Sequence, residues 1–284
     1  MIITAAARAK INLTLDILGK RPDGYHEVEM VMQSIELHDS LEFIPAGRDI
    51  ILTVEGADLA PGPDNLVYQA AELLRRQGRI KAGVKIRLIK AIPVAAGLGG
   101  GSANAAAALK ALNELWETGL SLSELMSLGA QLGSDVPFCL LGGTALAKGR
   151  GELLERLPPC PRLGLVLIKP QFSVSTASVY RAYTPGPAVN RPDNQVMISA
   201  IRNKDINGIA QNLANALESV TTRMHPEIGR IKAKLSRAGA LGVLMCGSGP
   251  TVFGLAADTE TARGIAGCYK SDGEEVFVTA TVDR

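Results

Sequence analysis

The chain has 284 residues, of which 46% are hydrophobic and 20% charged, a composition that is typical of a soluble globular protein and excludes a disordered one. Its length favours two domains and leaves one large α/β domain as the alternative. Thirty Lys and Arg residues against 28 Asp and Glu residues leave a formal charge of +2, too small to predict nucleic acid or a membrane as partner. The four cysteines form no CxxC pair, so neither a zinc site nor a disulfide framework is expected.

The N-terminal segment carries Arg8 and Lys10 where a secretory signal needs an apolar core. No apolar run reaches the length of about 18 residues that a membrane-spanning helix needs. Together with the cysteine usage, this indicates a protein of the reducing cytoplasm. The sequence leaves its oligomeric state open.

The first part of the chain is predicted to be rich in strands. Apolar and polar residues alternate over 9–15, which places Lys10 and Asn12 on one face of a strand. A turn at 19–24 precedes a second extended run at 25–37, so Tyr25 and His26 lie beside a turn. Further strands are predicted at 40–44, 49–54 and 84–88, with a helix at 65–77.

The strand at 84–88 leads into a glycine loop and an alanine-rich helix that we expect to start at Ser102. A capping box at Ser121 opens another helix, which Gly133 can end. The proline-rich segment 158–161 is the predicted boundary between domains 1–157 and 158–284. Beyond it we expect strands at 163–168, 242–245, 252–256 and 275–281, and helices at 176–183, 208–220 and 226–238.

The glycine loop 97–101 predicts an anion site. Without Cβ atoms, its main-chain N–H groups can converge on a phosphate, and the N-terminus of the following helix adds a positive dipole end. The loop matches neither the Walker A nor the Rossmann fingerprint. The plainer alternative is a tight turn into a closely packed alanine helix, and the second glycine loop, 247–250, could likewise be an ordinary turn.

The run 93–104 resembles the phosphate loop of the galactokinase, homoserine kinase, mevalonate kinase and phosphomevalonate kinase (GHMP) superfamily. Segments 9–13, 21–26 and 132–138 resemble one branch, whose substrate is a cytidine-diphosphate-linked sugar alcohol, and 247–250 resembles the superfamily's C-terminal glycine motif. The resemblance implies a two-domain α+β fold with ATP and substrate in the interdomain cleft. It also implies phosphorylation of the substrate's 2-hydroxyl in the non-mevalonate route to isoprenoid precursors.

By the same resemblance, Lys10 and Asp135 are the catalytic residues. Asp135 would accept the proton of the substrate hydroxyl, and Lys10 would pair with Asp135 and stabilise charge on the phosphoryl group. Without the motif, Asp135 would be interpreted as a helix cap and Lys10 as a solvated lysine. Asn12 is expected to bind the polyol of the substrate.

Tyr25 is expected to stack on cytosine and His26 to bind the edge of the base. Tyr180, with Thr176 upstream of it, matches a second aromatic position that the branch places on the opposite face of cytosine. Taken alone, Tyr25 and His26 would be a cross-strand aromatic and an exposed imidazole. The predicted ATP-binding residues are Pro93, Val94, Ala95, Ala96, Gly97, Leu98, Gly99, Gly100, Gly101, Ser102 and Ala103.

ATP implies Mg²⁺, held mainly by phosphate oxygens and water, with the Ser102 hydroxyl as one possible contact. No carboxylate cluster identifies protein ligands for the metal. Two alternatives stay open: another GHMP small-molecule kinase, such as a homoserine or mevalonate kinase, and a catalytically silent sensor of nucleotide and sugar. Tyr25 and His26 speak against the first, and the presence of both Lys10 and Asp135 against the second.

Overall fold

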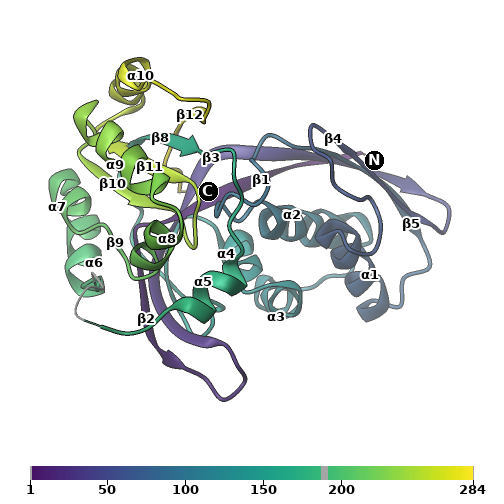
Figure 1. Ribbon diagram of the computed structural model, residues 1–284. Helices are drawn as coiled ribbons and strands as arrows, with labels where there is room; N and C mark the ends of the chain where they lie inside the picture. Colours follow the sequence, from purple (N-terminus) through teal and green to yellow (C-terminus); the bar gives the residue numbers. More distant parts are fainter. Residues whose placement is uncertain (1, 187–190, 284) are drawn as a thin grey trace. The chain divides into compact units, whose positions relative to one another are not determined.

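The computed structural model describes residues 2–186 and 191–283 (Figure 1). The chain forms two compact units, each assembled from separate stretches: unit 1 is 1–9, 37–94 and 99–142, and unit 2 is 10–36, 95–98 and 143–284. The two units therefore alternate along the chain, whereas each of the predicted domains, 1–157 and 158–284, is one continuous stretch. The predicted boundary between residues 157 and 158 stays a prediction.

The elements follow in chain order: β1 (Ile3–Asn12), β2 (Thr14–Lys20), β3 (His26–Ala46), β4 (Ile50–Glu55), α1 (Leu66–Gln77), β5 (Gly83–Ile89), α2 (Gly100–Leu115), α3 (Leu122–Leu132), α4 (Val136–Leu141), β6 (Thr144–Lys148), β7 (Leu153–Arg156), β8 (Gly164–Lys169), α5 (Thr176–Ala182), α6 (Asn194–Arg202), α7 (Ile206–Gln211), β9 (Ala214–Asn215), α8 (Glu218–Met224), α9 (Glu227–Arg237), β10 (Gly242–Met245), β11 (Val252–Ala256), α10 (Thr259–Cys268) and β12 (Glu275–Ala280).

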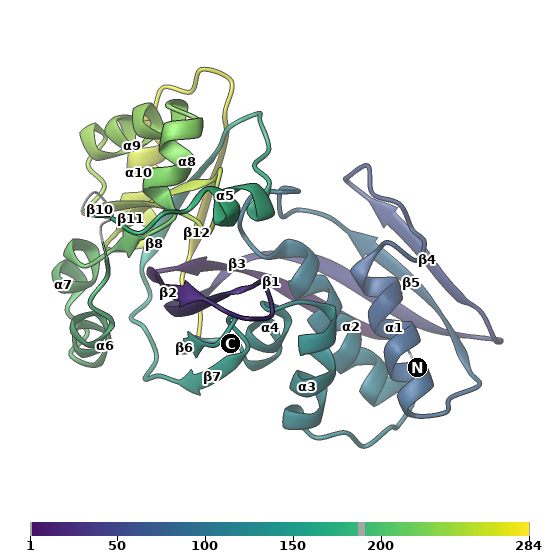
Figure 2. The ribbon, with the colours of Figure 1, turned by 60° about the horizontal axis from the view of Figure 1, so that its bottom comes forward.

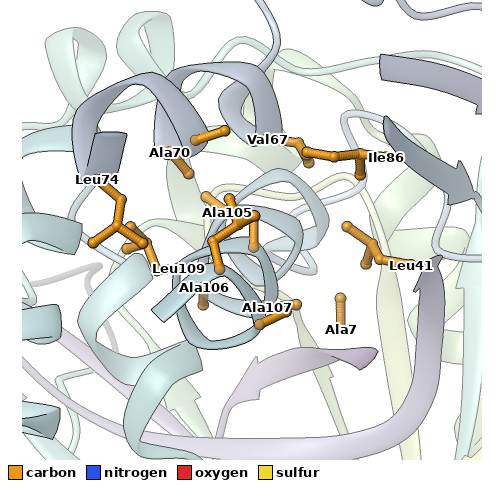
Figure 3. Packing of buried hydrophobic residues seen from close by; sticks show 14 of the residues in the cluster. Ala7, Leu41, Val67, Ala70, Leu74, Ile86, Ala105, Ala106, Ala107 and Leu109 are labelled. Carbon is orange, nitrogen blue, oxygen red and sulfur yellow. The ribbon is translucent and has the colours of Figure 1, made fainter. Parts of the chain in front are cut away.

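In unit 1, helices pack on a sheet in which β5 pairs parallel with β4 and antiparallel with the second half of β3. Side chains of β5 alternate between the buried Val84, Ile86 and Leu88 and the exposed Lys85 and Arg87. The buried face meets α1 and α2 in one hydrophobic cluster. Figure 3 shows its centre, to which α2 contributes mainly alanines: Ala105, Ala106, Ala107 and Leu109 from α2, Val67, Ala70 and Leu74 from α1, and Leu41 and Ile86 from the sheet.

Unit 2 contains a four-stranded antiparallel sheet in the order β10-β11-β8-β12, with α9 and α10 packed against it (Figure 2). Every residue of the central strand β8 is buried. The same unit holds the hairpin of β2 and β3, in which Lys20 pairs with His26 and Asp16 with Glu29. Strand β9 runs parallel to β2, and β6 pairs with the first half of β3. No helix among the described residues is both long and apolar enough to cross a membrane.

The predicted helix at 208–220 is wrong. The chain instead forms α7, the short strand β9 and α8, because Ala214 and Asn215 pair with Thr14 and Leu15 of β2. The predictions also miss α4, α6, α10, β6 and β7. The two strands expected at 25–37 and 40–44 are one 21-residue strand, β3.

Candidate active site

The glycine loop before α2 adopts backbone conformations that residues with side chains rarely adopt. Gly97 and Gly99 have φ angles of 78° and 71°, and Ala95 is held at 53°, which strains the loop. At Gly97 the space is also closed, because a Cβ atom would lie 2.4 Å from the carbonyl oxygen of Cys246 and 2.8 Å from that of Gly249. The two glycine motifs, far apart in sequence, therefore pack directly against each other.

Helix α2 begins at Gly100, two residues before the predicted start at Ser102. Its N-cap is the left-handed Gly99, and no side chain caps the first turn. The Ala103 N–H already bonds the Gly99 carbonyl oxygen at 2.9 Å. Because side-chain caps do not occupy the earlier N–H groups, the first turn presents donors and a positive dipole end suited to an anion.

Lys10 and Asn12 lie side by side on β1, as the strand alternation predicts. Lys10 is buried, and its Nζ donates a 3.0 Å hydrogen bond to Asn12 Oδ1. The Asn12 amide nitrogen donates in turn to the Met30 sulfur at 3.1 Å. A Cβ atom at Gly247 would lie 3.5 Å from Lys10 Nζ and 3.4 Å from the Gly97 carbonyl oxygen. Unit 2 thus gathers the lysine, the asparagine and parts of both glycine motifs at one point.

The second glycine motif is held by polar side chains of its own unit. Buried Asn215 donates from its amide to the carbonyl oxygens of Met245 at 2.9 Å and Gly247 at 2.7 Å. The Ser248 hydroxyl lies 2.8 Å from that of Thr176, a predicted substrate contact at the start of α5. Thr176 is therefore coupled to the loop that borders Lys10.

Asp135 directly precedes α4 in unit 1. Its side chain makes no capping hydrogen bond to that helix, which removes the helix-cap alternative as the reason for an aspartate here. A Cβ atom at Gly133, two residues earlier, would lie 3.7 Å from Ser102 Oγ, so the segment before Asp135 borders the first turn of α2. Lys10 belongs to unit 2, and its pairing with Asp135 stays a prediction.

Four aromatic rings and an arginine surround the start of β3. The His26 ring lies 5.3 Å from the Tyr180 ring and 6.5 Å from the Tyr183 ring. Tyr25 is 53% exposed, and the Arg150 guanidinium lies 4.9 Å from its ring centroid. The structure thus brings Tyr180 to His26, and it adds Tyr183 and Arg150, for which the sequence carried no signal.

Burial lowers the pKa of His26 below its ordinary value of 6.5, and the positive charge of Lys20, its partner across the hairpin, lowers it further. The imidazole is therefore neutral at pH 7. A neutral ring offers one donor and one acceptor, which suits the edge of a nucleobase.

Across residues 2–186 and 191–283, no group of three or more His, Cys, Asp or Glu side chains could hold a metal ion. A magnesium ion caged by protein ligands alone does not fit these residues. Asn215, Ser248, Tyr183 and Arg150 are the neighbours of the site that the sequence analysis did not name. Only Ser248 carried a signal, since it lies within a recognised glycine motif.

Comparison with known families matches residues 65–143 to "GHMP kinases N terminal domain" and residues 197–275 to "GHMP kinases C terminal". A relative from Pelotomaculum thermopropionicum, named 4-diphosphocytidyl-2-C-methyl-D-erythritol kinase, is 67% identical over 282 residues, covering 99% of this chain and 98% of the relative. A protein of the same name from Moorella thermoacetica is 49% identical over 284 residues, covering 99% of each chain.

Solved structures give the same fold. A crystal structure of 4-(cytidine 5'-diphospho)-2C-methyl-D-erythritol kinase has a TM-score of 0.82 and 35% sequence identity, covering 98% of this chain and 99% of that one. Homoserine kinase from Cytophaga hutchinsonii has a TM-score of 0.79 at 20% identity, covering 99% and 95% of the two chains. The second likeness shows the fold alone.

Proposed function

Because the chain belongs to the GHMP kinase family, we propose that it transfers the γ-phosphoryl group of ATP to the 2-hydroxyl of 4-diphosphocytidyl-2-C-methyl-D-erythritol. The full-length similarity to relatives of that name, up to 67% identical, supports this substrate over homoserine or mevalonate. The reaction belongs to the non-mevalonate route to isoprenoid precursors, and its expected setting is the cytoplasm.

The structural observation that supports the proposal is the arrangement of side chains along β3. His26 and Met30 are four residues apart on this strand, so they lie on one face about 13 Å apart at the usual rise per residue. One end carries aromatic rings and a neutral imidazole; the other contacts Asn12 and, through it, Lys10. An extended substrate with a base at one end and a hydroxyl at the other matches this arrangement.

The phosphates of ATP would bind the segment 93–103, which contains the glycine loop, with the N–H groups of the first turn of α2 as donors. Lys10 would stabilise the charge on the phosphoryl group in transfer, while Asp135 accepts the hydroxyl proton. Asn12 and Thr176 would orient the sugar alcohol. Mg²⁺ would be bound by the phosphate oxygens of ATP and would neutralise part of their charge.

The test is whether the purified protein phosphorylates the cytidine substrate with ATP. Homoserine, mevalonate and galactose are assayed in parallel as acceptors, and phosphorus NMR identifies the product. A new phosphomonoester on the cytidine substrate alone supports the proposal. Turnover of another acceptor would make the chain a different GHMP kinase, and nucleotide binding without turnover of any acceptor would favour the sensor.

A further inference from the structure

Unit 1 contains a buried polar cluster that no step of the proposed reaction uses. It consists of Asp39 on β3, Lys90 just after β5, and Asn104 on α2. The Asp39 side chain is fully buried and that of Lys90 is 4% exposed. Burying two charges is costly unless they are paired and hydrogen-bonded, so such a cluster in a core requires a reason.

The Asp39 carboxylate is saturated with donors. Oδ1 accepts from the backbone N–H groups of Ala91 at 2.7 Å and Ile92 at 2.8 Å. Oδ2 accepts from the Asn104 amide at 2.7 Å and from the Lys90 ammonium. Lys90 also donates to the Asn104 amide oxygen at 3.2 Å, which closes the cluster.

These contacts hold both ends of the predicted ATP-binding segment 93–103, which contains the glycine loop. Ala91 and Ile92 directly precede its first residue, Pro93, and Asn104 follows its last, Ala103. The cluster also lies against the first turn of α2, since a Cβ atom at Gly100 would lie 3.0 Å from Ile92 Cγ2 and 3.3 Å from Lys90 Nζ. One carboxylate therefore sets the distance between the two ends of the segment that would hold phosphate.

We infer that Asp39, Lys90 and Asn104 are positioning residues for nucleotide binding. They hold the glycine loop in the conformation that binds phosphates, and they keep the net charge beside the first turn of α2 neutral. This inference rests on the proposed ATP site. A loop held in its binding conformation loses less entropy when the ligand binds, so the cluster should act on ATP affinity. A lone carboxylate so close to the phosphate site would repel ATP, and Lys90 cancels that charge.

The charge balance between Asp39 and Lys90 predicts how KM for ATP should rank in three variants. Lys90→Met leaves the buried Asp39 charge uncompensated, and we expect KM for ATP to rise about 10- to 100-fold. The double variant Asp39→Asn/Lys90→Met restores neutrality and should recover at least part of that loss. Asn104→Ala keeps the ion pair and suits a helix, so it should fold and raise KM for ATP only several-fold. KM for the cytidine substrate should stay within about twofold in all three.

The matched control is Thr144→Val in unit 2. It also breaks two hydrogen bonds of a buried side chain, one of 2.7 Å to Gln33 and one of 3.0 Å from the Cys160 N–H. It should lower thermal stability and leave KM for ATP unchanged, which separates positioning from general destabilisation.

The experiment measures KM for ATP and for the cytidine substrate in wild type, Asn104→Ala, the double variant and Thr144→Val, with Lys90→Met added if it folds. A rise in KM for ATP without a rise in KM for the cytidine substrate supports the inference. A lower KM for ATP in the double variant than in Lys90→Met supports it as well. If KM for ATP is unchanged in both Asn104→Ala and the double variant, the positioning role is overturned. Turnover by the wild type would still support the proposed function in that case. A wild-type protein without turnover would overturn the proposed function, and this inference with it.

Discussion

The Lys10 ammonium donates a 3.0 Å hydrogen bond to the Asn12 side-chain oxygen, two residues along β1, and both side chains are buried. The bond consumes one of the three ammonium protons and directs the side chain towards Gly247. Lysine at this position is thus fixed in place before any substrate binds.

Replacing Lys10 by Met should lower kcat about 100- to 1,000-fold, because a preorganised charge at the phosphoryl group is lost from the transition state. Steady-state kinetics with both substrates saturating measures this. The exposed Lys85 on β5 supplies the control, since Lys85→Met should leave kcat unchanged. Near-normal kcat in Lys10→Met would remove the lysine from the catalytic step.

Asp135→Asn should reduce kcat strongly, because the amide cannot accept the proton of the substrate hydroxyl. Thermal unfolding and single-turnover kinetics are measured on the same sample. An amide variant with full kcat and unchanged substrate binding would show that positioning alone drives the transfer.

Gly97→Ala should be costlier than Gly119→Ala, although both residues have positive φ angles, of 78° and 67°. A Cβ atom at Gly119 meets nothing within 4 Å, so its variant should lose about 1–2 kcal/mol from backbone strain alone. At Gly97 the contacts with the Cys246 and Gly249 carbonyls should add about 1–3 kcal/mol.

Urea unfolding of the two glycine variants gives the free energies, and the same samples give kcat. Gly97→Ala should also lose activity because the two glycine motifs must separate, whereas Gly119→Ala should keep it. Equal losses of stability and activity in both variants would contradict the close packing described for Gly97.

The affinity for the cytidine substrate should fall as the pH drops through the folded-state pKa of His26, which lies below 6.5. Burial first, and the Lys20 charge second, lower the pKa of His26 in the folded chain. The stability contributed by the neutral imidazole is therefore present above the unfolded-state pKa of 6.5 and is lost as the pH falls through the lower folded-state value. Protonation would also remove the acceptor that faces the base.

NMR titration of the His26 ring measures this pKa directly. Lys20→Met should raise it towards 6.5, and Lys85→Met in unit 1 should not move it. A His26 resonance that titrates above pH 6.5 in the wild type would rule out a neutral ring as the base-reading group.

Local patterns predicted the features that depend on neighbours in sequence. The alternation around Lys10 and Asn12 gave their shared face, and the Ser121 capping box is present with both of its hydrogen bonds. The three consecutive glycines allow main-chain N–H groups to converge on a phosphate, and the resemblance to the GHMP phosphate loop favours this interpretation over a tight turn.

Contacts between distant segments could not be predicted in this way. Asn215 lies in a stretch with a helical pattern, yet its pairing with β2 makes it extended and turns its amide to the second glycine motif. Arg150 reaches Tyr25, and Tyr183 reaches His26, only through the fold. Asp39 lies between the predicted strands 25–37 and 40–44 and carried no signal in the sequence, and only the fold shows that it is buried and accepts from four donors.

The most direct test of the account compares kcat/KM for three acceptors: 4-diphosphocytidyl-2-C-methyl-D-erythritol, its uridine analogue, and the same sugar alcohol phosphate without cytidine monophosphate. Recognition of the cytidine end predicts that kcat/KM falls about 10-fold or more for the uridine analogue, whose base edge differs, and further for the truncated acceptor, which reaches neither Tyr25 nor His26. Equal kcat/KM for all three acceptors would contradict recognition of the cytidine end at the start of β3.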